Sequence, residues 1–180
     1  MVRRLLFALT AFGLLVIAAP ASTRADTGHV GMLGGVAVVD ESGETQWRPH
    51  ARTEIGFRLW GPFELGGFLQ LTTLGFPMEM ASFGGGLFVQ LRPDTALFGF
   101  VPYLEGSGSR VTLPVADGRV DAWGVSAGGG LGYEVGAGVV IEARVLHHWY
   151  FDLPGNGPSG TGEVGVDGWS LTAGVTYRMP

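Results

Sequence analysis

The chain has 180 residues, no cysteine and no lysine, and a net charge of −5 at pH 7. Its length fits one domain, and charged residues make up only 15% of it, against about 25% in ordinary soluble domains. The missing cysteine excludes a disulfide scaffold, thiolate metal sites and a lipid-anchored lipoprotein. The absence of a basic run argues against binding to nucleic acid.

Residues 1–25 have the pattern of a secretory signal peptide. Two arginines are followed by an apolar run, and small residues offer a cleavage site after Ala21 or Ala25. The apolar run is shorter than the roughly 20 residues that span a bilayer as a helix, so an uncleaved anchor is the weaker alternative. We therefore expect an exported protein whose folded domain is residues 26–180.

After this segment, polar and apolar residues alternate in short stretches that are separated by Gly, Pro, Asp and Asn. Alternation with a period of two is typical of β-strands, and no segment has a sustained helical period. The pattern predicts eight strands, at residues 28–39, 50–60, 63–73, 81–92, 96–106, 122–134, 137–151 and 167–179.

The strand predicted at residues 137–151 shows the alternation most clearly. One parity is largely apolar, whereas the other carries Glu142 and Arg144. The strand at residues 167–179 repeats this design, and the apolar face of each strand has an aromatic residue near one or both ends. A strand whose outward face crosses lipid between two interfaces has this pattern.

The connections between the predicted strands alternate in length. Three are short, at residues 61–62, 93–95 and 135–136. Four are long, at residues 40–49, 73–80, 106–121 and 152–166. Short turns at one end and long loops at the other are typical of an up-and-down barrel with both termini on the short-turn side. In an outer membrane that side faces the periplasm.

Aromatic residues on the apolar parity fall at the two ends of the predicted strands. Those at the long-loop ends are Trp123, Trp149, Phe151 and Trp169. Those at the short-turn ends are Phe63, Phe98, Tyr133 and Tyr177. Two such belts are expected where a barrel meets the lipid headgroups. Trp60 lies at the right height but on the inward parity, so it receives no role.

With these features the chain resembles the small eight-stranded outer-membrane barrels of the OmpA/OmpX type over residues 26–180. Its last strand, with Val175, Tyr177 and Met179 on one parity, resembles the terminal signal that the barrel assembly machinery reads, although such strands usually end on an aromatic residue. The resemblance implies an all-β, eight-stranded, up-and-down antiparallel transmembrane barrel in the outer membrane. Its partners would be outer-membrane lipid, lipopolysaccharide and the assembly machinery.

A soluble lipocalin-like barrel would have the same alternation with its apolar faces inside. Two features favour the transmembrane sense. The polar faces are rich in Gly and Ser and carry few charges, whereas a wall exposed to solvent is ordinarily more charged. Aromatic belts have a clear role at lipid headgroups but none in water.

In the transmembrane sense, the charged residues on the polar parity point into the lumen. They are Arg52, Glu54, Arg58, Glu64, Glu105, Glu134, Glu142, Arg144 and Arg178. A lone charge in a low-dielectric interior is costly, so we expect Glu–Arg pairs between strands. The inward face of residues 122–134 is mostly Gly and Ser, and large side chains of residues 137–151 should lean over it. Eight strands leave room only for side chains, which predicts a plugged lumen without a wide pore.

His147 and His148 are the candidates for chemistry. Neighbouring residues of a strand point to opposite faces, so the two rings cannot face one metal ion. His148 with Asp152 and Ser170 could form a hydrolase-like triad, but the His-x-Ser arrangement of the outer-membrane lipid A deacylases is missing. We expect interface histidines beside an aromatic belt, and no enzyme activity, metal site or cofactor.

The predicted long loops are mainly acidic. A solvated rim is the simple interpretation, and a sharper one is divalent-cation binding beside the lipopolysaccharide phosphates. The function that follows is a structural or surface-interaction role, in membrane integrity or adhesion, for a monomer whose surface ligand the sequence does not identify. A lipid-modifying enzyme and a small-solute channel or carrier are the alternatives, because a fold does not by itself supply a function.

Overall fold

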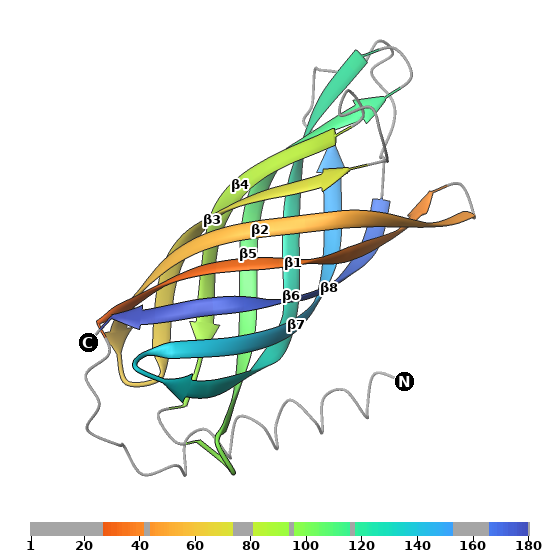
Figure 1. Ribbon diagram of the computed structural model, residues 1–180. Helices are drawn as coiled ribbons and strands as arrows, with labels where there is room; N and C mark the ends of the chain where they lie inside the picture. Colours follow the sequence, from red (N-terminus) through yellow and green to blue (C-terminus); the bar gives the residue numbers. More distant parts are fainter. Residues whose placement is uncertain are drawn as a thin grey trace, which may run out of the picture.

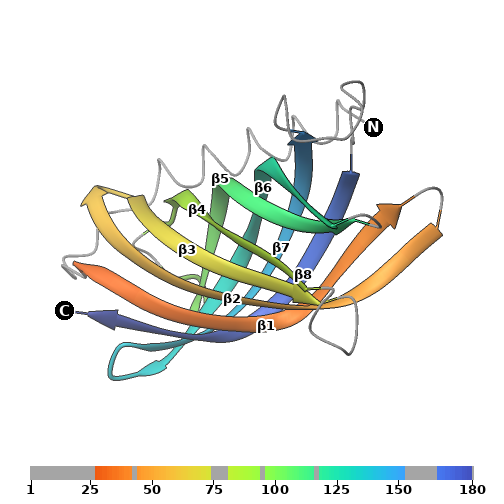
Figure 2. The same ribbon diagram turned by 90° about the horizontal axis from the view of Figure 1, so that it is seen from above.

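The computed structural model describes residues 27–41, 44–73, 81–93, 96–115, 118–152 and 166–179, and the signal-peptide prediction lies outside them. Eight antiparallel strands form a closed barrel, each paired with its neighbours in sequence (Figure 1). β1 and β8 lie side by side and close the ring (Figure 2). Closure leaves no unpaired sheet edge within the wall, as a bilayer requires. The predicted fold class is confirmed.

The strands are long, between 11 and 19 residues. They are β1 (Gly28–Glu41), β2 (Glu44–Trp60), β3 (Phe63–Thr73), β4 (Ala81–Leu91), β5 (Phe100–Val115), β6 (Gly118–Gly136), β7 (Val139–Asp152) and β8 (Val166–Met179). No helix in the described part of the chain is long and apolar enough to cross a membrane.

The barrel has its apolar side chains outside and its charged side chains inside. Leu87 on the outer wall is 66% exposed, and Ile141 and Val175 are exposed as well. Glu142 and Arg144, which alternate with the outward residues of β7, are each only 1% exposed. This is the predicted transmembrane sense, opposite to that of a lipocalin-like barrel.

Two predicted long loops are instead continuations of strands. β1 and β2 pair as far as Glu41 and Glu44, and β5 and β6 pair as far as Val115 and Gly118. The Gly–Ser run at residues 106–109 suggested a loop, but these residues build the wall: Ser107 and Ser109 are buried in the lumen and the two glycines face outward. These small residues therefore belong to a paired strand rather than to a connection.

The inward facing predicted for Trp60 was wrong, because its side chain lies on the outer wall. The pairing of β2 with β3 shifts register between Arg58 and Trp60, as at a β-bulge, and Trp60 lies opposite Phe63. Its ring packs on Phe63 with 5.5 Å between centroids, and both side chains are exposed. A bulge adds one residue to a strand and so exchanges its two faces, which a strict period of two does not anticipate.

The start of the fifth strand was also predicted too early. Residues 96–99 form a turn ahead of β5, because Phe98 and Gly99 have φ angles of 55° and 84°. Such angles are incompatible with a strand. Phe98 therefore lies at the tip of a turn and not on the barrel wall.

Candidate functional site

The centre of the lumen is an ion-pair network around Arg144. Its two Nη atoms each donate a hydrogen bond of 2.7 Å to a different oxygen of Glu54, across the lumen from β7 to β2. Glu105 Oε2 lies 3.1 Å from Nη1, and Glu142 Oε2 lies 3.4 Å from Nη2. The Nε atom donates to the Tyr103 hydroxyl at 2.9 Å. A planar guanidinium suits this arrangement because it offers five donors in a fixed geometry.

Arg52 links the same carboxylates from the neighbouring side. Its Nε atom lies 3.0 Å from Glu54 Oε2, and its Nη2 atom lies 2.8 Å from Glu105 Oε1. Neither contact has the alignment of a hydrogen bond, so these are ion pairs held mainly by charge. The guanidinium also lies 3.9 Å above the ring of Phe68, a cation–π contact.

Arg92 is a member of the network that the sequence reasoning missed. It is buried, donates a 2.7 Å hydrogen bond to Glu142 Oε1, and lies 4.1 Å above the ring of Tyr103. Arg92 follows the last residue of β4, yet it continues the inward parity of Phe88 and Gln90. That parity was the signal that could have revealed it.

Glu64 is the shared acceptor of the ion pairs nearest the short turns. Its carboxylate lies 3.3 Å from Arg58, 3.2 Å from Arg178 and 3.3 Å from the ring of His29. His29 also lies 3.6 Å from Glu54, and it too was missed because the facing of the first strand was assigned from its apolar residues alone. Glu134 is exposed beside the register shift at the end of β6.

Large side chains fill the space over the inward glycines. A Cβ atom on Gly130 would lie 2.6 Å from the Tyr103 hydroxyl, and one on Gly124 would lie 3.0 Å from the ring of Tyr150. Tyr103 comes from β5, whereas the large side chains were predicted to come from residues 137–151, on the other side of β6. Glycine on one strand thus admits an aromatic ring from its neighbours, and the described lumen is packed rather than open.

The loop-side half of the lumen is held together by hydrogen bonds between histidines and hydroxyl groups. His148 forms two hydrogen bonds, one between Nδ1 and Ser126 Oγ at 2.7 Å and one between Nε2 and Ser170 Oγ at 2.8 Å. His50 bonds Thr72 Oγ1 at 2.8 Å. These side chains are buried or half-buried, and each partner lies on an adjacent strand.

The triad considered in the sequence is brought together only in part. His148 and Ser170 are within hydrogen-bonding distance, but Asp152 is not among the side chains that the structure describes. Ser170 is buried in the barrel, so a lipid ester would need an opening to reach it. His147 points to the other face and packs between Trp149 and Trp169, with centroids 4.3 and 4.4 Å away.

The residues of the two predicted aromatic belts lie mainly on the outer wall. Trp123, Phe151 and Trp169 are exposed at the loop end. Phe63, Tyr133 and Tyr177 are exposed at the short-turn end. Trp149 is half-buried against His147, and Phe98 lies on a turn. Exposed Trp47, Trp60 and Phe100 are further aromatic residues that the prediction left out.

Val175, Tyr177 and Met179, the predicted assembly signal, share the outward parity of β8. Val175 and Tyr177 are exposed and Met179 is half-buried. The backbone carbonyl of Met179 accepts a 3.1 Å hydrogen bond from Thr27, which joins the two ends of the described chain.

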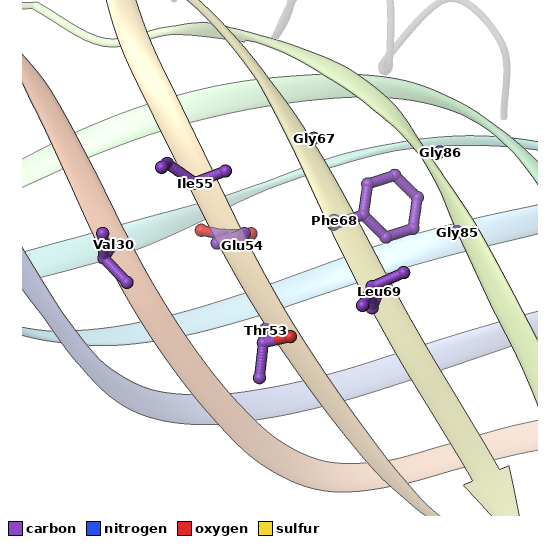
Figure 3. A pocket seen from close by; sticks show the side chains of 9 residues that line it. All are labelled: Val30, Thr53, Glu54, Ile55, Gly67, Phe68, Leu69, Gly85 and Gly86. Carbon is purple, nitrogen blue, oxygen red and sulfur yellow. The ribbon is translucent and has the colours of Figure 1, made fainter.

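The outer wall carries a shallow groove of about 570 Å³ across β1 to β4 (Figure 3). Gly67, Gly85 and Gly86 form its floor, and Ile55 and Leu69 are among the apolar side chains beside it. The carboxylate of Glu54 belongs to the lumen and is fully buried. The groove therefore continues the apolar outer wall and offers no charged group to a polar ligand.

Asp121 is the one acidic residue of the predicted loops whose side chain the structure describes. Its carboxylate accepts a hydrogen bond of 2.6 Å from Arg110 and one of 2.7 Å from Thr112. These bonds hold the pKa of Asp121 below its usual value. Among the described residues, no group of three or more His, Asp or Glu side chains is placed to hold a metal ion.

No protein-family model and no curated protein matches the chain. The solved structures that are similar to it include the following three. Neisserial surface protein A is 17% identical, with a TM-score of 0.64, over 84% of this chain and 97% of that one. The N-terminal β-barrel domain of Pseudomonas aeruginosa OprF is 14% identical, with a TM-score of 0.58, over 84% and 97%. Ail, the attachment invasion locus protein of Yersinia pestis, is 12% identical, with a TM-score of 0.52, over 86% and 99%.

These likenesses show the fold. The chain has the architecture of the small eight-stranded outer-membrane β-barrels, and the resemblance seen in its sequence is confirmed at that level.

Proposed function

We propose that the chain is an integral outer-membrane barrel with a structural or surface-interaction role, in membrane integrity or adhesion. The observation that carries the proposal is the distribution of side chains, with exposed Leu, Val, Ile and Phe around the wall and paired Glu and Arg inside. In water this arrangement would expose a large apolar surface, whereas in lipid it buries that surface. The similar solved structures include a surface protein and an attachment protein, which is consistent with a surface role.

The packed lumen supports this role over that of a channel. Arg144 donates hydrogen bonds to Glu54 and Tyr103, and Arg92 donates one to Glu142. An eight-stranded barrel has an interior just wide enough for side chains. We therefore expect no porin-like conductance in planar bilayers, and conductance steps of porin size would contradict the plugged lumen.

The aromatic belts and the terminal strand belong to the same proposal. The belts would hold the barrel at the two headgroup layers, and Val175, Tyr177 and Met179 would be read by the barrel assembly machinery. The proposal also includes export and cleavage of the signal peptide within residues 1–25. The mass of the mature protein would reveal whether the cut follows Ala21 or Ala25.

The test is fractionation of cells that express the full chain, followed by gel electrophoresis with and without heating. We expect the protein in the outer-membrane fraction, and a faster-migrating folded form in the unheated sample that heating converts to the unfolded mobility. Recovery in the soluble periplasmic fraction would overturn the proposal.

A second candidate, a lipid hydrolase, is favoured by the 2.8 Å contact of His148 with Ser170. Acylation of lipid A should be compared in cells that express the wild type and His148→Ala at equal levels. Equal acylation in the two would remove the hydrolase, and a difference that depends on His148 would replace the structural role.

A further inference from the structure

The connection from β4 to β5 ends in a tight turn, Leu97 to Phe100. The backbone N–H of Leu97 donates to the carbonyl of Phe100 at 2.7 Å, and the N–H of Phe100 donates to the carbonyl of Leu97 at 3.0 Å. The two central residues, Phe98 and Gly99, both have positive φ angles. A two-residue turn with this geometry is of type I′.

Phe98 is an unfavourable residue for its position. Type I′ turns prefer Asn, Asp or Gly at the first central position, because a bulky side chain clashes with the backbone at positive φ. Phe98 is also 92% exposed, so packing within the chain does not offset that cost. Strained residues of this kind often lie at functional sites.

The turn is fixed to the outer wall of the barrel. The ring of Phe100 lies 5.1 Å from that of Tyr133 on β6. A Cβ atom on Gly99 would lie only 2.8 Å from the Tyr133 ring, so that ring packs directly on the turn backbone. The turn extends beyond the strand ends at the rim that holds the C-terminus (Figure 1), and Leu97 adds a further exposed apolar side chain.

The surroundings of the turn indicate what covers it. The chain has no charged residue from Ala96 to Leu104. Phe100, at the base of the turn, pairs with Tyr133 in the belt of the short-turn side, and both side chains are exposed on the outer wall. The apolar tip is therefore continuous with the wall that faces lipid, and aromatic rings are favoured at the level of the headgroups.

We propose that the Leu97–Phe100 turn is a lipid anchor that inserts Phe98 into the headgroup layer of the periplasmic leaflet. The proposal rests on the proposed membrane location and adds to it a defined contact outside the barrel wall. The strain at Phe98 is then offset by transfer of its ring from water into the interface.

The chain offers a matched control. Ala137, in the turn between β6 and β7 at the same rim, also has a positive φ, of 51°, but no aromatic side chain. F98N creates the Asn-Gly dipeptide that type I′ turns favour and removes the ring. A137N relieves the same kind of backbone strain, adds the same carboxamide side chain and removes no aromatic ring.

The first test is urea unfolding of both variants in phosphatidylcholine vesicles. We expect A137N to leave the midpoint unchanged or to raise it. F98N should lower the midpoint and decrease the folding equilibrium constant several-fold, despite its better turn. If F98N raises the midpoint, the ring contributes nothing in lipid and the proposal is wrong.

The second test measures the depth of the turn, and it uses the absence of cysteine from the chain. Phe98→Cys, Ala137→Cys and Leu87→Cys are each labelled with a fluorophore and refolded into vesicles that contain nitroxide lipids. We expect acyl-chain nitroxides to quench the label at 87, headgroup nitroxides to quench the label at 98 more strongly than the label at 137, and aqueous iodide to reach 98 poorly.

The outcomes separate the two proposals. Quenching at 87 together with free access of iodide to 98 leaves the membrane barrel standing and overturns the anchor, as expected if a periplasmic protein covers the turn instead. Failure of quenching at 87 overturns the membrane location itself.

Discussion

The two halves of the lumen are filled by different kinds of side chain. Towards the short turns the interior is charged, and Arg144 reaches Glu54 across the barrel although 90 residues separate them. Towards the loops, His148 instead forms hydrogen bonds to Ser126 and Ser170 on the strands beside it. The ion pairs of the charged half join distant strands, whereas these hydrogen bonds join neighbours that the sheet already holds together.

This difference decides how each half should respond to mutation. Removal of one partner from a buried ion pair leaves the other as a lone charge in a medium of low dielectric constant. Removal of one partner from a neutral hydrogen bond costs less, because hydroxyl groups can rotate to other acceptors. The charged half should therefore be the more sensitive to single substitutions. This sensitivity does not mean that the intact ion pairs contribute more to stability than the hydrogen bonds of the other half.

The largest effect is expected for Arg144→Met, which leaves Glu54, Glu105 and Glu142 without their shared partner. We expect a loss of about 3–5 kcal/mol in the free energy of unfolding, measured by urea titration in vesicles. Arg144→Met with Glu54→Gln should recover part of that loss, because one lone charge is removed. A double variant as unstable as the sum of the two single variants would contradict the network.

An intermediate effect is expected for Gly130→Ala. The new methyl group would meet the carbonyl of Ala143 and the ring of Tyr103, the latter at 2.6 Å, and overpacking of this kind costs about 1–3 kcal/mol. Gly108→Ala is the control, because nothing lies within 4 Å of the added atom. It should be neutral or slightly stabilising by the same titration, and equal losses in both variants would argue against a packed lumen.

A smaller effect is expected for His148→Gln in the loop-side half. The glutamine amide can replace one of the two hydrogen bonds to Ser126 and Ser170, so the loss should be about 1 kcal/mol. The same unfolding titration tests this value. A loss as large as that of Arg144→Met would remove the distinction between the two halves.

The smallest effect is expected for Arg110→Gln. Its ion pair with Asp121 lies outside the barrel, and the Arg110 side chain is 62% exposed. Exposed pairs are screened by solvent and contribute little. We expect an unfolding midpoint that is indistinguishable from that of the wild type, and a clear shift would indicate that the loop-side hairpin takes part in the stability of the barrel.

Sequence alone predicted the strands and their facing because side-chain direction in a strand depends only on parity. Glu142 and Arg144 illustrate this success, since each was placed in the lumen from its position beside apolar residues. Parity does not identify partners, however. The pairing of Arg92 with Glu142 depends on the stagger of strands 50 residues apart, which a local pattern does not contain.

The other errors arose where the strand pattern is interrupted. Trp60 faces outward because of the register shift next to it, and Phe98 left the wall because of a type I′ turn. Glu134 has the inward parity, but it lies at a register shift near the end of β6 and is exposed. In each case one residue at positive φ or at a bulge changed the direction of side chains that the period of two had assigned.

The most direct test of the orientation uses four consecutive residues of β5. Gly106, Ser107, Gly108 and Ser109 are replaced one at a time by cysteine, which is close in size to serine and finds open space at the two glycines. Each carries a nitroxide label in vesicles, and collisions with oxygen and with a polar nickel chelate are measured. We predict oxygen-accessible, chelate-protected labels at 106 and 108, and immobile labels protected from both at 107 and 109. Chelate access at 106 and 108, with oxygen access at 107 and 109, would contradict the account.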